Sequence, residues 1–270
     1  MLGLGNMMTG GAALEDVFTP ESISNIALWL SWNTNITADK DSGGNTVSPE
    51  HSTAAGTMAN GDHINFWGAA GSTSVNATQD TKQDQPRWST TTGEVGGILS
   101  ANNNKHMDLS SPITFAANTD FTIVVRFRAN DFGGARVFLG DDSNEFVRLD
   151  DENTIRFKTD GTTSDVNSGT DLVADKDTTL IIVRSDGSTG NVNMFVRGKD
   201  SGYFDGTATG TAFGSEFQDT EEIAVSNIMA SDDNTNEFDG TFKDVIIYNG
   251  TAVTSAQREQ IFDYLEAQED

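Results

Sequence analysis

The feature that most constrains the fold of this chain is a strand followed by a helix near residue 250. Residues 238–249 read FDGTFKDVIIYN, in which a turn leads into an apolar strand. In residues 254–265, Thr254 can cap a helix and Gln257 lies three positions on, as in a capping box. Apolar side chains at helical spacing form one face of this segment: Ile261, Phe262 and Leu265. A helix this short is not stable alone, so we expect it to pack on a sheet.

Most of the remaining pattern predicts β-structure. In residues 121–128, Phe and aliphatic side chains alternate with polar ones and place Arg126 and Arg128 on the opposite face. Residues 179–184 are apolar on both faces, which predicts a central strand. Four Asp-Gly pairs favour tight hairpin turns: Asp160-Gly161, Asp186-Gly187, Asp205-Gly206 and Asp239-Gly240. Many short strands joined in this way indicate an antiparallel sandwich or jelly roll.

The charge of the chain is strongly one-sided. Sixteen Lys and Arg stand against 41 Asp and Glu, giving a net charge of −25. Such a surface repels phosphate, so we expect no nucleic-acid partner and no binding to anionic membranes. No apolar run approaches the ~20 residues that span a bilayer, and residues 1–13 lack the basic start of a signal peptide. We therefore expect no export by a general secretion route.

Residues 1–20 are predicted to form an extended N-terminal arm, followed by one domain over residues 21–270. The arm is rich in glycine, yet it carries apolar side chains that a solvated tail would not need: Leu2, Leu4, Met7 and Met8. We expect these four residues to dock on a partner.

The closing segment resembles that of concanavalin A-like (laminin G-like) jelly-roll domains. The matching positions are Asp244, Tyr248, Arg258, Tyr264 and Leu265. Residues 76–79 (NATQ) and 85–86 (QP) also resemble these domains, and the resemblance extends over about residues 21–267. It implies an all-β antiparallel jelly-roll sandwich with one C-terminal α-helix. In style, the chain is most similar to domains of bacteriophage structural proteins.

Motifs for catalysis are not evident in the sequence. Sandwich glucanases of this fold carry Glu-x-Asp-x-x-Glu on one strand, and this chain has no such motif. The histidines, His51, His63 and His106, lack the spacing of a zinc site or a nucleophile triad, and cysteine is absent. We therefore expect no catalytic residues, no fixed metal ligands and no enzymatic activity.

Two kinds of ligand remain open. Calcium could be held by the acidic loops Asp141-Asp142 and Asp232-Asp233-Asn234, against the simpler interpretation of solvated charge. A sugar would need exposed aromatic side chains, and Trp88, Tyr203 and Phe204 are the candidates. Trp29 and Trp67 lie in apolar strands and are expected in the core.

The sequence-based hypothesis is a non-enzymatic virion structural protein. Its leading form is a homo-oligomeric capsid decoration protein that docks on the major capsid protein through the arm. The alternative is a carbohydrate-binding adhesin module of a phage tail or fibre. A lyase or hydrolase is the third interpretation, which the missing carboxylate motif disfavours.

Overall fold

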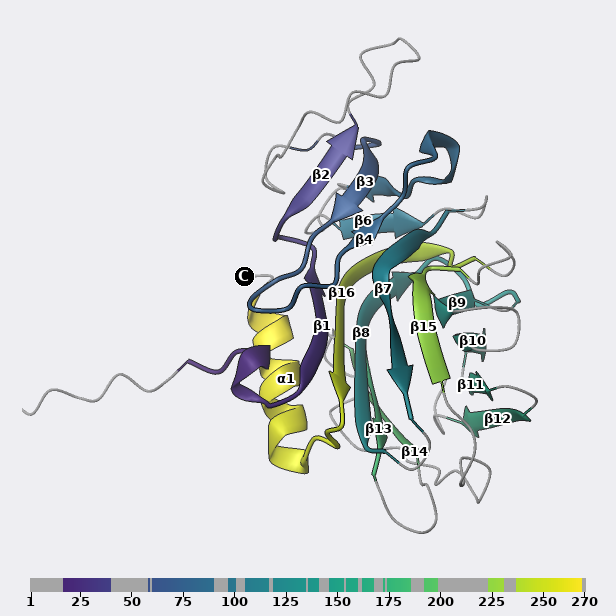
Figure 1. The fold of residues 1–270 in the computed structure, drawn as a ribbon. Coiled ribbons are helices and arrows are strands. Elements are labelled where there is room, and N and C mark those ends of the chain that lie inside the picture. Colours follow the sequence, from purple (N-terminus) through teal and green to yellow (C-terminus); the bar gives the residue numbers. More distant parts are fainter. Residues whose placement is uncertain are drawn as a thin grey trace, which may run out of the picture.

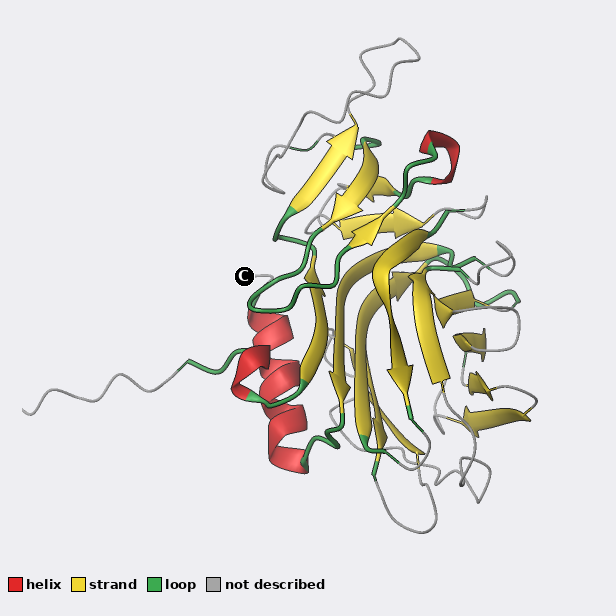
Figure 2. Ribbon diagram, viewed as in Figure 1, coloured by secondary structure: helices red, strands yellow, loops and turns green. Residues whose placement is uncertain are grey.

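A computed structural model gives the architecture of the chain. It describes residues 17–39, 58, 60–89, 97–100, 105–116, 119–134, 136–140, 146–152, 154–159, 162–167, 172, 174–185, 192–198, 223–230 and 237–268. Within these ranges the protein is almost entirely β-sheet, with one α-helix and short 3-10 turns (Figure 2). No described helix is long and apolar enough to cross a membrane.

Fourteen of the sixteen described strands follow one another along a single hydrogen-bonded path, and the other two each pair with a member of it. In chain order the sixteen strands are β1 (Ile26–Ser31), β2 (Ile36–Asp39), β3 (His63–Trp67), β4 (Ala77–Thr78), β5 (Arg87–Ser89), β6 (Gly97–Ser100), β7 (Met107–Phe115), β8 (Phe121–Ala129), β9 (Arg136–Gly140), β10 (Phe146–Asp151), β11 (Thr154–Thr159), β12 (Thr162–Asn167), β13 (Asp177–Arg184), β14 (Val192–Gly198), β15 (Ile223–Ile228) and β16 (Gly240–Asn249). Every pairing is antiparallel, as predicted.

The path folds over on itself, so that two layers enclose the main core. One layer contains β1, β16, β8, β13 and β14, and the other contains β3, β4, β7, β15, β9 and the strands beyond (Figure 1). Rings from opposite layers meet between them: the centroid of Phe138 on β9 lies 4.7 Å from that of Phe127 on β8 and 5.9 Å from that of Phe242 on β16. This packing of inward-facing side chains from two sheets confirms the sandwich architecture.

The helix α1 (Ser255–Ala267) covers the outer face of the first layer (Figure 1). Thr254 Oγ1 accepts from the Gln257 backbone N–H, and Gln257 Oε1 accepts from the Thr254 N–H, which confirms the predicted capping box. The predicted apolar face is also confirmed, because Ile261, Phe262 and Leu265 are buried. They pack in a second core with outward-facing residues of the strands: Trp29, Val124, Ile181, Val183, Ile246 and Tyr248.

Charged groups are buried where α1 meets the sheet. Arg126 and Asp244 are cross-strand partners with side chains 2% and 0% exposed, and their charged atoms lie 3.9 Å apart. Arg126 also donates to the carbonyl of Leu265 in the last turn of α1, where a cation complements the helix dipole. Arg126 does lie on the outer face, as the alternation predicted, but the helix removes it from solvent.

Details of the turns differ from expectation. Gly240 begins β16 opposite Ala129, and a Cβ at this position would come within 2.1 Å of the Arg128 carbonyl. Asp239-Gly240 is therefore a close backbone approach and not a two-residue hairpin. The other three Asp-Gly pairs, Asp160-Gly161, Asp186-Gly187 and Asp205-Gly206, lie outside the described residues. The short strand β2 was not predicted by the sequence pattern, and it pairs with β3.

Removing the apolar contact of α1 should destabilise the whole protein. We expect Leu265→Ala to lower the free energy of unfolding by about 2–5 kcal/mol, because the side chain is fully buried and a cavity would remain. Urea unfolding followed by tryptophan fluorescence measures this loss. The control is Gln260→Ala on the exposed side of α1, which should change stability by less than about 0.5 kcal/mol. Equal effects of the two substitutions would contradict the packing described here.

Candidate binding face on the second layer

The outer face of the second layer carries polar side chains on five neighbouring strands. Met107, Leu109, Ala77, Ile64 and Trp88 all belong to the main core. Successive side chains of a strand point to opposite faces, so the residues between and beside them point away from the core. We call this outer surface of β15, β7, β4, β3 and β5 the open face. Within the described part of the chain, α1 lies on the other layer and does not cover it.

A row of hydrogen-bonding groups crosses the open face in register. Thr78 on β4 pairs with Asp108 on β7, and Asp108 pairs with Asn227 on β15. The Asp108 side chain is 55% exposed, whereas Asn227 is 3% exposed and lies at the base of the row. Backbone pairing fixes the spacing of all three residues, which is the rigid placement that a polar binding site requires.

A buried polar network supports one end of this row. The Gln79 Oε1 atom accepts from the Thr81 backbone N–H at 2.9 Å, so the amide nitrogen of Gln79 faces His106. That nitrogen lies 2.9 Å from His106 Nε2, which therefore accepts, and Asp108 Oδ1 lies 3.5 Å from the same ring nitrogen. Gln85 completes the network by donating to the Gln79 carbonyl at 2.9 Å. The network holds the chain between β4 and β5, and Asp108 lies beside it.

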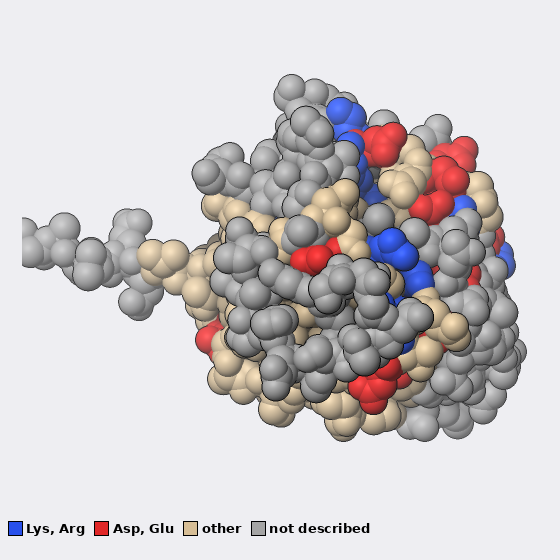
Figure 3. Space-filling model, turned by 90° about the horizontal axis from the view of Figure 1, so that it is seen from above, with Lys and Arg blue, Asp and Glu red and all other residues tan. Residues whose placement is uncertain are grey.

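Basic side chains gather around the 3-10 turn η3 (Lys82–Asp84) beside this network. His63 pairs across strands with Arg87, and the His63 ring nitrogen Nδ1 lies 3.1 Å from the Lys82 carbonyl. Lys105 donates from Nζ to the carbonyl of Gln83. Figure 3 views the end of the molecule where β2, β3 and β6 lie, and it shows Lys and Arg side chains there among Asp and Glu side chains.

The electrostatics of this basic group are consistent with its geometry. Burial, together with the charges of Arg87, Lys82 and Lys105, lowers the pKa of His63. Burial and the charge of Arg87 also lower the pKa of Lys105, while Asp84 acts in the opposite direction. In both cases a nearby positive charge contributes to the lowered pKa. The basic group is therefore locally positive, although the net charge of the chain is −25.

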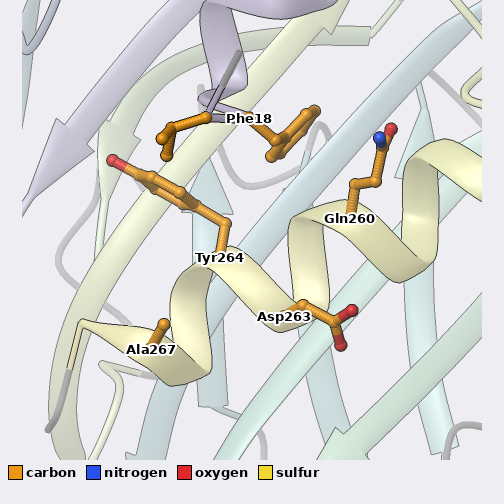
Figure 4. Close-up of a pocket in the computed structure, with 6 residues that line it drawn as sticks. Phe18, Gln260, Asp263, Tyr264 and Ala267 are labelled. Carbon is orange, nitrogen blue, oxygen red and sulfur yellow. The ribbon is translucent and has the colours of Figure 1, made fainter. Parts of the chain in front are cut away.

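A mainly apolar hollow lies beside α1. It has a volume of about 310 Å³ and is lined by Val17, Phe18, Gln260, Asp263, Tyr264 and Ala267 (Figure 4). Phe18 and Tyr264 meet edge to face with ring centroids 6.1 Å apart, and Tyr248 donates to the Pro20 carbonyl at 3.0 Å. These contacts attach residues 17–23 to α1 and to β16. The hollow offers few polar groups and is the weaker candidate for a polar ligand.

The structure places three of the aromatic residues that were predicted to lie in the core or to contact a sugar. Trp29 and Trp67 are buried, as predicted. Trp88 is 2% exposed and packs in the main core, so the prediction that it is exposed for stacking on a sugar is wrong. Its strand β5 alternates, and the side chain that points outward is Arg87. Tyr203 and Phe204 lie outside the described residues, as do the predicted arm contacts Leu2, Leu4, Met7 and Met8.

The acidic candidates can be placed only in part. Asp141-Asp142 and Asp232-Asp233-Asn234, the expected calcium loops, lie outside the described residues. Among the residues that the structure does describe, no group of three or more His, Asp or Glu side chains is arranged to hold a metal ion. Asp150, next to Asp151 and Glu152, binds Arg148 at 2.7 Å and Arg156 at 3.0 Å through its two oxygens. It therefore belongs to an ion-pair network.

Several solved structures with carbohydrate-active enzymes as their subject superpose on this chain. A GH54 α-L-arabinofuranosidase soaked with a cyclic sulfate inhibitor superposes with a TM-score of 0.63 at 11% identity, over 90% of this chain and 63% of its own. An arabinofuranosidase complexed with arabinofuranosyl-α-1,2-xylobiose gives 0.50 at 13% identity, over 74% and 50%. Domain 4 of a GH43 extracellular arabinanase from Geobacillus stearothermophilus, in complex with arabinotriose, gives 0.48 at 14% identity, over 86% and 96%.

The two arabinofuranosidases contradict the expectation that the protein is not an enzyme. That expectation rested on the absence of a glucanase motif from the sequence. The arabinofuranosidases have this fold at only 11% and 13% sequence identity, so one missing motif is a weak argument. The match shows the fold alone, and this chain spans less than two thirds of either arabinofuranosidase. No curated protein matches the sequence.

The buried glutamine network should contribute measurably to stability. Gln85 is fully buried, and its loss would leave the Gln79 carbonyl without this donor. We expect Gln85→Ala to lower the free energy of unfolding by about 1–3 kcal/mol. Thermal or urea unfolding measures the change, and Gln83→Ala, an exposed side chain in the same turn, is the matched control. A Gln85 variant as stable as the Gln83 variant would show that the network does not hold this turn.

The family of the chain follows from its sequence as well as from its architecture. Residues 101–257, more than half of the chain, match the Laminin_G_3 model, described as concanavalin A-like lectin/glucanases superfamily. The matched region contains β7 and the strands from β8 to β16, hence both layers of the sandwich and the start of α1. The two-layer antiparallel fold and this match agree, and the chain belongs to the concanavalin A-like lectin/glucanases superfamily.

Proposed function

We propose that this protein binds carbohydrate and that the open face is its binding surface. The observation that carries the proposal is the row formed by Thr78, Asp108 and Asn227, three hydrogen-bonding residues that are cross-strand neighbours on the face without α1. A sugar presents several hydroxyl groups, each able to donate and accept. A rigid surface of carboxylate and hydroxyl groups, with a buried amide beneath it, matches this chemistry.

The comparisons with known proteins support the proposal of carbohydrate binding. The family name includes lectins and glucanases, and both arabinofuranosidases with the same fold act in carbohydrate chemistry according to their names. They favour the alternative of a carbohydrate-binding module over the hypothesis of capsid decoration, for which they provide no support. A position in a virion and docking on a capsid protein stay predictions.

Truncating the central carboxylate of the row should weaken carbohydrate binding. The first step is to screen the full chain by affinity electrophoresis against soluble polysaccharides, including arabinan and arabinoxylan. For a polysaccharide that binds, we expect Asp108→Ala to reduce affinity about tenfold, the loss of one hydrogen bond to a charged group. Isothermal titration calorimetry measures this change.

The control is Asp263→Ala, which removes the same charge from an exposed position on α1. It should leave affinity within about twofold, because α1 covers the opposite layer. Both variants should retain the far-UV circular dichroism spectrum of the parent. Retention of full affinity by the Asp108 variant, or an equal loss in the Asp263 variant, would argue against the open face as the binding surface.

A further inference from the structure

We propose that the ligand of the open face is an anionic polysaccharide, whose carboxylate or sulfate groups bind Arg87 and Lys82 at the edge of the face. This inference rests on the carbohydrate-binding function proposed above and specifies the class of sugar. The observation that carries it is the convergence of three of the 16 Lys and Arg residues, Lys82, Arg87 and Lys105, with His63.

Backbone pairing produces this convergence. Arg87 is the cross-strand partner of His63, and the Lys82 carbonyl contacts the His63 ring at 3.1 Å. Lys105 reaches the residue next to Lys82, since its Nζ donates to the Gln83 carbonyl. The backbone N–H of His106 donates to the Asp84 carbonyl at 3.2 Å, which fixes the start of β7 against the same turn. Three separate segments of the chain are therefore held together at η3.

The four basic residues differ in their access to a ligand. His63 and Lys105 are 9% and 8% exposed and form the base of the group. Arg87 is exposed and Lys82 is half-buried, so their charged ends are the ones that a polymer can reach. Among the described residues, Arg87 forms no ion pair. A guanidinium group binds carboxylates and sulfates through two parallel hydrogen bonds, which makes Arg87 the principal anchor.

Acidic side chains border the site, so only direct contacts with the basic residues can favour an anionic ligand. Asp84 lies near Lys105, Asp62 precedes His63, and Asp108 belongs to the hydrogen-bonding row. With a net charge of −25, the protein as a whole repels a polyanion. At physiological salt this repulsion is screened beyond about 8 Å, whereas direct contacts persist. Binding of a polyanion would therefore report a local site and not a general attraction of charge.

The experiment compares anionic polysaccharides with their neutral counterparts. Polygalacturonate is paired with its methyl-esterified form, and dextran sulfate is paired with dextran. The affinity of the full chain is measured by calorimetry at physiological salt. We expect at least one anionic polymer to bind at least tenfold more tightly than its neutral partner. The two pairs also distinguish carboxylate from sulfate recognition.

Variants then assign the anionic contact to Arg87. Arg87→Gln should weaken binding of the anionic polymer about tenfold, and Arg87→Lys, which keeps the charge without the two-pronged geometry, should lose less. Lys176→Gln, which removes one positive charge beside β13 in the other layer, is the matched control and should stay within about twofold. Unchanged melting temperatures show that the variants are folded, and the Arg87→Lys variant serves if Arg87→Gln is unstable.

The outcomes separate this inference from the proposed function. Equal affinity for neutral and anionic polymers, or anionic binding that ignores both Arg87 variants, would overturn the inference and leave carbohydrate binding intact. Failure of the parent protein to bind any polysaccharide, neutral or anionic, would contradict both.

Discussion

Burial of β16 on both of its faces is the constraint on which the rest of the structure depends. All of its residues but Asn249 are buried. Phe242, Val245 and Ile247 face the second layer, whereas Ile246 and Tyr248 lie under α1. β16 also pairs with β1, β6 and β8, so it connects most of the first layer. Because Ile246 and Tyr248 form an apolar outer side of β16, α1 covers them, and the open face lies on the other layer.

The open face depends on buried polar groups for its shape. A buried amide or imidazole is costly unless it is hydrogen-bonded. Hydrogen bonds join Gln79 to His106, to Gln85 and to the backbone of Thr81, so these residues stabilise a single conformation of the chain between β4 and β5. This segment carries Lys82 and leads directly into Arg87. The same network therefore supports the hydrogen-bonding row and positions the basic group.

The sequence was sufficient to predict the elements whose pattern is local. The capping residues and the apolar face of α1 specified the helix, and the residues apolar on both faces within β13 specified a strand between two others. The order of the strands depends on contacts between residues far apart in the sequence, and here the family resemblance contributed more than periodicity. Alternation predicted that Arg126 points outward, but it did not reveal that the C-terminal turn of α1 covers this side chain.

The binding face was less predictable, and the reason is physical. A search for exposed aromatic residues led to Trp88, although the alternation of β5 places Trp88 in the core and Arg87 outside. Gln79 and Gln85-Pro86 were recognised as part of a family pattern without a role, which the hydrogen bonds now provide. The pairing of Asp108 with Thr78 and Asn227 joins segments 30 to 119 residues apart, and no local pattern encodes that proximity.

The most direct test of this account is hydrogen–deuterium exchange of the full chain with and without a bound polysaccharide. Binding at the open face predicts slower exchange in β4, β7 and β15 and in the segment around η3, with α1 and residues 17–23 unchanged. Protection confined to α1 and the hollow beside Phe18, with no change in β7, would contradict it.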